Sequence, residues 1–277
     1  MIEKVGILGA GVMGQGLAFT LAQRGFEVVL WDRKDIKNIN KRLEKNIIYV
    51  KMNKKMKKQA INKIKVTINL DDMSNVDLIL EAVIEDMRVK KTLLKKISKI
   101  CSHNTIISTN TSSLSIDQLS RVVYKPRRFI GLHFFNPPNK MKLIEIIKNK
   151  NTSSNTISQA IIFIKRLDKT PIVIKDSPGF IVNRLLFPLI NDAANLLEER
   201  IATKEDIDNA MRLGANFPIG PLQIADLVGI DTTYKIINEL HRRSKGCRIK
   251  PSNSFKKLIK NKKLGQKNEM GFYLYKK

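Results

Sequence analysis

Residues 4–32 read KVGILGAGVMGQGLAFTLAQRGFEVVLWD, and this stretch decides the fold of the first half of the chain. Lys4–Leu8 is a short apolar run, the next residues are rich in glycine, and Gly14–Arg24 carries apolar residues at helical spacing. Glu27–Trp31 is a second apolar run. A strand, a tight turn, a helix and a second strand in this order predict a βαβ unit.

The glycine-rich turn matches the pattern G-x-G-x-x-G in a context that gives the pattern meaning. It follows a predicted strand, opens a predicted helix and precedes an acidic residue at the end of the second strand, which is typical of a dinucleotide-binding loop. We expect the first glycine to permit the turn and the second to let the backbone approach a pyrophosphate at the helix N-terminus. The expected cofactor-binding residues of this loop are Gly9, Gly11, Val12, Met13 and Gly14.

Asp32 is the acidic residue at the end of the second strand. Its carboxylate is expected to accept hydrogen bonds from the adenosine ribose hydroxyls and to repel a 2′-phosphate. This favours NAD as the cofactor. Arg33, the next residue, leaves NADP as an alternative.

Further apolar runs alternate with helical stretches up to residue 177 and predict a mostly parallel sheet with helices on both faces. The runs are Ile64–Ile68, Leu78–Ala82, Ile106–Ser108, Phe129–Leu132, Leu143–Ile147 and Pro171–Lys175, and the helical stretches lie near 38–60, 86–100 and 154–168. Beyond this point only helices are expected, over Phe180–Glu199, from the cap at Thr203 and over Gly229–Arg243. We therefore expect a Rossmann-like α/β domain over residues 1–177 and an all-α domain over 178–277.

Length and composition agree with two folded domains. The 277 residues contain 43% hydrophobic and 27% charged residues, which excludes wholesale disorder. No apolar run approaches about 18 residues, so no membrane span is expected. Two cysteines without metal-ligand spacing predict free thiols and no metal site, and without a visible leader the expected location is the cytoplasm.

The net charge of +26 is concentrated in two segments. Residues 33–65 hold 13 Lys or Arg against 2 Asp or Glu, and residues 242–277 hold 13 against 1. Such patches could bind nucleic acid, an anionic membrane surface or a phosphorylated ligand, or they could reflect compositional drift alone. Aromatic residues make up only 6%, and no nucleic-acid-binding motif is present, so no specific nucleic-acid partner is expected.

His133 and Glu145 are the candidate catalytic pair. His133 follows the apolar run Phe129–Leu132, where a strand ends, and Glu145 lies inside the apolar run Leu143–Ile147. A carboxylate in such a run is costly to bury unless it is paired. The two residues are twelve positions apart, which suits a strand, a turn and a returning strand. Coincidence is the alternative.

Several longer motifs resemble the L-3-hydroxyacyl-CoA dehydrogenase family, over essentially the whole chain. They are Asn110–Leu114 (NTSSL), His133–Pro137 (HFFNP), Met141–Glu145 (MKLIE), Ser177–Arg184 (SPGFIVNR), Pro218–Pro221 (PIGP), Gly229–Thr233 (GIDTT) and Gly271–Tyr273 (GFY). The resemblance implies an NAD-dependent enzyme that interconverts a short-chain (S)-3-hydroxyacyl-CoA, such as 3-hydroxybutyryl-CoA, and the 3-ketoacyl-CoA. It also implies a helical domain that closes over the acyl-CoA and forms a homodimer.

The same resemblance assigns roles to residues at matching positions. His133 is implied to be the general base, oriented by Glu145, with Ser112 and Asn183 holding the C3 oxygen and the thioester region of the substrate. The remaining cofactor-binding residues implied are Glu85, Lys90, Asn110, Ser112 and Asn136. Lys51 and Lys54 are the candidates for the phosphates of coenzyme A. The chain departs from the family at Thr109, where serine is common, and at the more polar Asn139–Lys140.

Other interpretations stay open. The fold also suits a dehydrogenase of a free hydroxy or sugar acid, and a basic NAD-binding protein without turnover would carry the same glycine loop. Ser112 could merely cap a short helix, and Asn183 could serve only the hydrogen bonding of its own helix.

Overall fold

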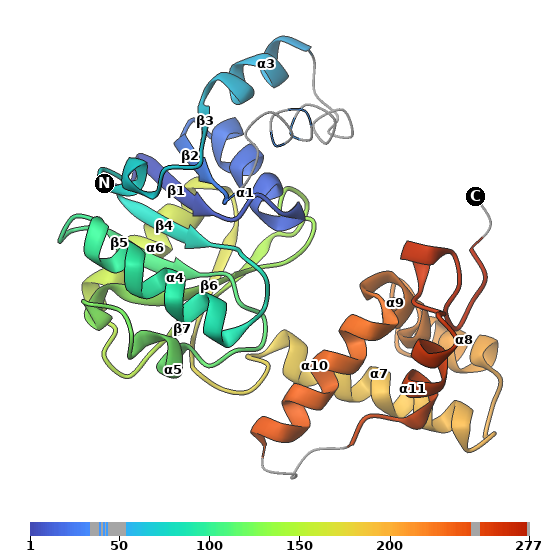
Figure 1. Ribbon diagram of the computed structural model, residues 1–277. Helices are drawn as coiled ribbons and strands as arrows, with labels where there is room; N and C mark the ends of the chain where they lie inside the picture. The colour runs from blue at the N-terminus through green and yellow to red at the C-terminus, as the bar shows by residue number, and fades with distance from the viewer. Residues whose placement is uncertain (34–38, 40, 42, 44–53, 245–249, 276–277) are drawn as a thin grey trace. The chain divides into compact units, whose positions relative to one another are not determined.

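The computed structural model describes residues 1–33, 39, 41, 43, 54–244 and 250–275 (Figure 1). The chain divides into two compact units, Met1–Ser177 and Pro178–Lys277. Each unit has its own hydrophobic core.

The first unit is built on a single sheet of eight strands among the described residues, in the order β3-β2-β1-β4-β5-β6-β7-β8. The strands are β1 (Lys4–Leu8), β2 (Glu27–Trp31), β3 (Ile64–Thr67), β4 (Leu78–Glu81), β5 (Ile106–Thr109), β6 (Phe129–Phe134), β7 (Leu143–Lys148) and β8 (Thr170–Lys175). All neighbouring pairs are parallel except β6 and β7. The mostly parallel sheet expected from the alternation of apolar runs and helices is confirmed.

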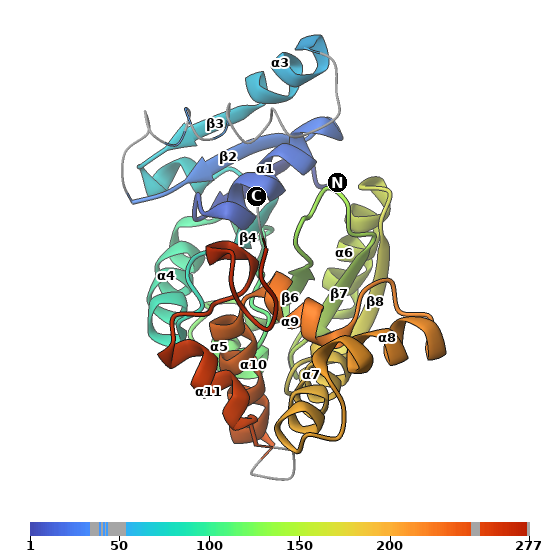
Figure 2. The ribbon, with the colours of Figure 1, turned by 90° about the vertical axis from the view of Figure 1, so that its right-hand side faces the viewer.

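Helices cover both faces of this sheet, as expected (Figure 2). They are α1 (Val12–Gln23), α3 (Lys54–Asn62), α4 (Met87–Ile100), α5 (Ile116–Ser120) and α6 (Ser154–Arg166), with short 3-10 helices η1 (Leu70–Met73) and η2 (Pro126–Arg128). One core joins side chains of α1, α3 and α6, among them Leu17, Ala60 and Phe163, to inward-facing strand residues. On the other face, Ile116 of α5 lies close against Gly131 of β6. A Cβ added at Gly131 would be only 2.9 Å from the Cδ1 of Ile116.

Side-chain caps fix where the helices begin. Asp86 accepts hydrogen bonds from the backbone N–H groups of Arg88 and Val89, at 2.8 and 2.9 Å, and so starts α4. The Ser115 hydroxyl accepts from the Gln118 N–H and starts α5. Each such cap contributes about 1 kcal/mol to stability and also sets where the preceding loop ends.

The second unit is helical, which confirms the expected change of texture after residue 177. Its elements are α7 (Val182–Glu198), α8 (Lys204–Gly214), α9 (Pro221–Val228), α10 (Ile230–Arg243), α11 (Asn253–Lys260) and η3 (Gln266–Asn268). Thr203 caps α8, as its sequence context predicts. The core includes Phe187, Ile190, Leu222 and Phe255. No helix among the described residues is long and apolar enough to cross a membrane.

A buried carboxylate fastens the C-terminal segment to this unit. Asp226 of α9 is fully buried and accepts hydrogen bonds from the backbone N–H groups of Phe272 and Tyr273, both at 2.9 Å. It also accepts from the Tyr275 hydroxyl at 3.0 Å. Burial raises the pKa of Asp226 despite these donors. The Gly271–Tyr273 motif therefore has a structural use in the second unit.

Candidate active site

The candidate site residues of the first unit follow the carboxyl ends of neighbouring strands. β1, β4, β5 and β6 are adjacent and parallel, so the loops that follow them lie along one edge of the sheet. The chain order reverses between β1 and β4, where open α/β sheets bind their ligands. Because β7 runs antiparallel to β6, its beginning lies at the same edge.

The loop after β1 is tightly packed at its first and third glycines and open at its second. Gly9 has a φ of +105°, and a Cβ there would lie 2.8 Å from the carbonyl oxygen of Ala82. A Cβ at Gly14 would overlap the carbonyl oxygen of Gly9, whereas a Cβ at Gly11 would meet nothing within 4 Å. Gly11 is the N-cap of α1 and has no side chain, so the first N–H groups of that helix are available to a phosphate from this open side.

Asp32 lies beside this loop and bonds to it. Its Oδ2 accepts a hydrogen bond from the Ala10 N–H at 2.7 Å, and its Oδ1 accepts from the Arg33 N–H at 2.7 Å. Asp32 lines a cavity of about 780 Å³, a size typical of small-molecule sites. Its other lining residues are Gly9, Gly11, Trp31, Arg33, Ile68, Leu70, Ala82, Val83, Ile84, Arg88, Val89, Thr92, Leu93 and Lys96. The walls are mainly apolar and also carry the Asp32 carboxylate and the cations Arg33, Arg88 and Lys96, a lining that fits the adenosine half of a dinucleotide.

His133 and Glu145 form the pair that the sequence predicts. They are directly opposite each other in the antiparallel pairing of β6 with β7, and the His133 Nδ1 lies 2.7 Å from the Glu145 Oε2. Both are buried, with 5% and 0% of their surface exposed. When the carboxylate accepts the Nδ1–H, the neutral imidazole is held in the tautomer whose Nε2 accepts a proton.

Residues around the histidine fix the end of β6. The Asn110 Oδ1 accepts a hydrogen bond from the backbone N–H of Phe134 at 2.8 Å, which ties the loop after β5 to the strand carrying His133. The ring of Phe135 lies 4.4 Å from the imidazole, centroid to centroid. Asn136 is exposed and precedes Pro137 in a cis peptide bond.

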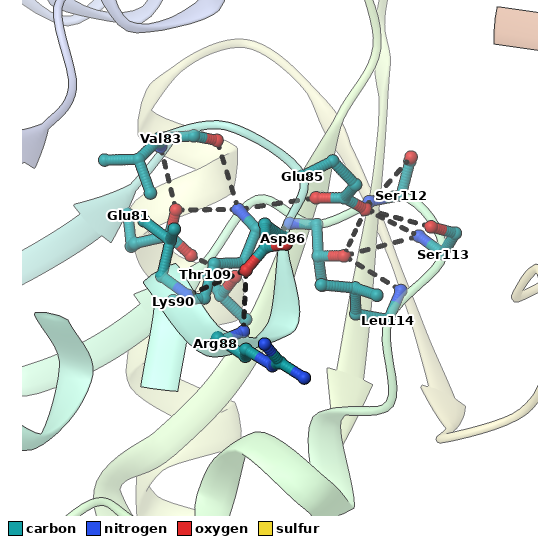
Figure 3. Close-up of polar contacts among 12 residues, drawn as sticks. Glu81, Val83, Glu85, Asp86, Arg88, Lys90, Thr109, Ser112, Ser113 and Leu114 are labelled. Atoms are coloured by element: carbon teal, nitrogen blue, oxygen red, sulfur yellow. Dashed lines mark hydrogen bonds and ion pairs between the residues drawn. The ribbon is translucent and has the colours of Figure 1, made fainter. Parts of the chain in front are cut away.

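A charged cluster at the ends of β4 and β5 contains Glu85 and Lys90, and it brings in a residue that the sequence analysis missed (Figure 3). Lys90 is 1% exposed, and its Nζ lies 2.7 Å from the Oε1 of the fully buried Glu81 and 3.4 Å from Glu85. Glu81 interrupts the apolar run Leu78–Ala82, just as Glu145 interrupts its own run. The same signal could have found it.

Glu85 in turn holds the loop that carries Ser112. Its Oε1 accepts hydrogen bonds from the backbone N–H groups of Ser112 and Ser113, at 3.0 and 3.2 Å. Burial raises the pKa of Glu85, but the charge of Lys90 and hydrogen bonds from the Thr111 and Ser113 hydroxyls and the Ser112 N–H outweigh it, and the pKa lies below its ordinary value. Ser112 is not the cap of α5, because that position belongs to Ser115.

The remaining candidates lie elsewhere. Asn183 is a buried residue of α7 in the second unit. Lys51 lies outside the described residues, and Lys54 is the first residue of α3. His103 is exposed, and His241 is in α10. Within the described part of the chain, no three His, Cys, Asp or Glu residues gather as a metal site would require.

Comparison with known proteins gives matches over nearly the whole chain. Residues 4–177 match the model of the 3-hydroxyacyl-CoA dehydrogenase NAD-binding domain, and residues 179–275 match that of the C-terminal domain. A 3-hydroxybutyryl-CoA dehydrogenase of Clostridioides difficile is 38% identical over 99% of this chain and 100% of its own length. The mitochondrial hydroxyacyl-coenzyme A dehydrogenase of Homo sapiens is 40% identical over 100% and 92%.

A solved structure agrees with these matches. The (S)-3-hydroxybutyryl-CoA dehydrogenase of Ralstonia eutropha superposes with a TM-score of 0.92 at 38% identity, covering 100% of both chains. The two matched domains coincide with the α/β unit and the helical unit described above.

Proposed function

The chain belongs to the 3-hydroxyacyl-CoA dehydrogenase family of oxidoreductases, with an NAD-binding domain at residues 4–177, and on that basis we propose that it interconverts (S)-3-hydroxybutyryl-CoA and acetoacetyl-CoA. The observation that carries the proposal is the buried His133–Glu145 pair, with 2.7 Å between nitrogen and oxygen. It lies at the sheet edge that also carries the dinucleotide loop.

The pair suits the proton that must move in this reaction. When bound, NAD supplies the acceptor for the hydride that leaves C3. The Nε2 of His133 takes the proton of the 3-hydroxyl group, and in the reverse direction it returns that proton to the carbonyl oxygen. Glu145 holds the imidazole in the required tautomer and stabilises the positive charge that the ring gains. General-base catalysis of this kind accelerates a reaction by roughly 10²–10⁴-fold.

The other polar candidates are assigned to binding. We propose that Ser112 and Asn183 hold the C3 oxygen and the thioester region of the substrate, and the C3 oxygen takes on negative character as the ketone is reduced. Asn110 and Asn136 flank the strand end that carries His133, which supports Asn110 as a cofactor-binding residue and a place for Asn136 between cofactor and substrate. Lys51 and Lys54 stay the candidates for the phosphates of coenzyme A.

The choice of NAD over NADP rests on Asp32. A carboxylate on the wall of the cavity accepts hydrogen bonds from ribose hydroxyl groups and repels a 2′-phosphate. Arg33 lines the same cavity, so the NADP alternative has a cation within the same walls. A comparison of rates with NADH and NADPH decides between the two.

One assay tests the proposal. NADH oxidation is followed with acetoacetyl-CoA, with longer 3-ketoacyl-CoAs and with free acetoacetate, each with NADPH in parallel. The proposal requires saturable turnover of acetoacetyl-CoA and a much lower kcat/KM for the free acid. Equal rates with the free acid would indicate a hydroxy-acid dehydrogenase on the same fold, and NADH binding without turnover of any ketone would indicate a binding protein.

We also propose a homodimer formed through the helical unit. Large apolar side chains are exposed there, with Leu213 at 82%, Leu185 at 69% and Ile201 at 65%. An apolar hollow of about 480 Å³ lies on the same unit, between α7 and α8. A second copy of the chain would cover such a surface, since exposed apolar patches mark association sites. Light scattering distinguishes a dimer from the 31.6 kDa monomer, and Leu213→Glu should shift the mass toward the monomer.

A further inference from the structure

We infer that Glu81 is a positioning residue of the active site: through the buried Lys90 it holds Glu85, and through Glu85 it holds the turn that carries Ser112 (Figure 3). The kinetic consequence rests on the proposed function. The geometric claim does not, because it concerns contacts within the first unit alone.

The first link is a buried ion pair in which both carboxylate oxygens of Glu81 accept hydrogen bonds. The Glu81 Oε1 accepts from the Lys90 ammonium at 2.7 Å and from the Val83 N–H at 2.8 Å, while its Oε2 accepts from the Thr109 hydroxyl at 2.6 Å. The end of β4 is thereby joined to the end of β5 and to the first turn of α4. The Lys90 Nζ also donates to the Val83 carbonyl oxygen at 3.3 Å. Lys90 is therefore fixed from the core side.

The second link joins Lys90 to the turn formed by residues 111–113. The two oxygens of Glu85 have different partners. Its Oε2 faces the Lys90 Nζ at 3.4 Å. Its Oε1 accepts from the Thr111 hydroxyl at 2.5 Å, from the Ser112 and Ser113 N–H groups, and from the Ser113 hydroxyl at 3.0 Å. One carboxylate oxygen thus organises the whole turn, while the other is anchored by a lysine.

Stability alone does not explain why charges stand here. A buried ion pair is often no more stable than well-packed apolar residues of similar size, because both ions lose their hydration. Glu85, by contrast, keeps 36% of its side chain exposed and depends on a fixed cation beneath it to hold its position. Glu81 supplies the counter-charge that holds this cation in place, with 2.7 Å between its Oε1 and the Lys90 Nζ. We therefore attribute the buried Glu81–Lys90 pair to its effect on the position of Glu85, at the exposed end of the cluster.

Amide hydrogen exchange in the cofactor-free protein tests the chain of contacts directly. In Glu81→Gln the Lys90 ammonium has Glu85 as its remaining carboxylate and draws it away from the turn. We expect amides 112–114 to exchange at least roughly fivefold faster, the effect of weakening one hydrogen bond. Asp86→Asn is the matched control: it removes a charge next to Glu85, retains a side chain that can cap α4, and should leave exchange of this turn unchanged.

A double variant covers the case in which Glu81→Gln folds poorly. Glu81→Gln/Lys90→Met removes both buried charges together, so its Tm should lie within roughly 5 °C of the wild type. Glu85 nevertheless lacks its cation there, and exchange at 112–114 should still be accelerated. Wild-type exchange at the turn in this double variant would overturn the inference, as would acceleration by the same factor throughout the first unit.

Kinetics give the second readout. In both Glu81 variants kcat for acetoacetyl-CoA should fall about tenfold while the KM for acetoacetyl-CoA changes less than about threefold, since the turn positions the reacting oxygen rather than the coenzyme A moiety. If amides 112–114 exchange faster in these variants while kcat is unchanged, the role of Glu81 in the active site would also be overturned. If the wild type itself fails to reduce acetoacetyl-CoA, the proposed function fails, and the exchange experiment still decides whether Glu81 holds the turn.

Discussion

Glu145→Gln should lower turnover by about 10- to 100-fold while leaving the protein folded and able to bind cofactor. Glutamine keeps the length of the side chain and an oxygen that can accept the His133 Nδ1–H at the observed 2.7 Å. What it removes is the negative charge at a position with 0% exposure, where no water can replace it. A hydrogen bond to a charged group contributes about 1.5–3 kcal/mol, and 1.36 kcal/mol corresponds to a factor of ten in rate.

The assay is steady-state NADH oxidation at saturating acetoacetyl-CoA, with NADH affinity measured by fluorescence titration. Glu27→Gln, an exposed position at the start of β2, is the matched control and should keep the wild-type kcat. Because the loss concerns a charge that develops during the reaction, kcat should fall while the Kd for NADH stays within about threefold. A Glu145→Gln enzyme with kcat within twofold of the wild type would refute the reasoning.

Three further changes have defined outcomes. Asp32→Ala should lower the preference for NADH over NADPH by about tenfold, because a hydrogen-bonding charge worth about 1.4 kcal/mol is lost, and an unchanged ratio of kcat/KM values would remove Asp32 from cofactor selection. Burial raises the pKa of Cys101 to about 12, so in a Cys247→Ser protein alkylation at pH 8 should run roughly 10³-fold slower than after denaturation; equal rates would contradict the burial. Asp226→Asn should leave a buried backbone donor unsatisfied at a cost of about 1–3 kcal/mol and lower the Tm, whereas Glu199→Gln at an exposed position should not. Equal Tm values for the two variants would show that the C-terminal segment is held otherwise.

The α/β half of the fold follows from sequence because the strands inside the sheet are buried and read as continuous apolar runs, whereas the edge strands β3 and β8 are partly exposed. The runs at Lys4–Leu8 and Glu27–Trp31 coincide with β1 and β2. The helices of the second unit are harder to predict from the sequence. The eight-residue helices α9 and α11 begin at Pro221 and Asn253, and each is too short for a clear apolar period. The helix expected over 38–60 lies largely outside the described residues.

The candidate site shows the same division. A glycine pattern and an acid inside an apolar run are local signals, and they predicted the dinucleotide loop and the spatial pairing of His133 with Glu145, although their roles in catalysis stay predictions. Glu81, Glu85 and Lys90 lie within ten residues of one another, but the contact of Glu81 with Thr109 and that of Glu85 with Ser112 need the side-by-side placement of β4 and β5, which no local pattern contains. The N-cap of α5 is likewise decided by three-dimensional geometry, because Ser112, Ser113 and Ser115 are all acceptable caps by residue type.

Replacement of His133 by glutamine, examined by NADH titration and by a single turnover with acetoacetyl-CoA, tests the central claim most directly. We expect the Kd for NADH to change by less than about threefold, while the rate of hydride transfer falls at least about 10²-fold, because the ring that exchanges the substrate proton is gone. Wild-type transfer in His133→Gln would show that this imidazole is not the acid–base group.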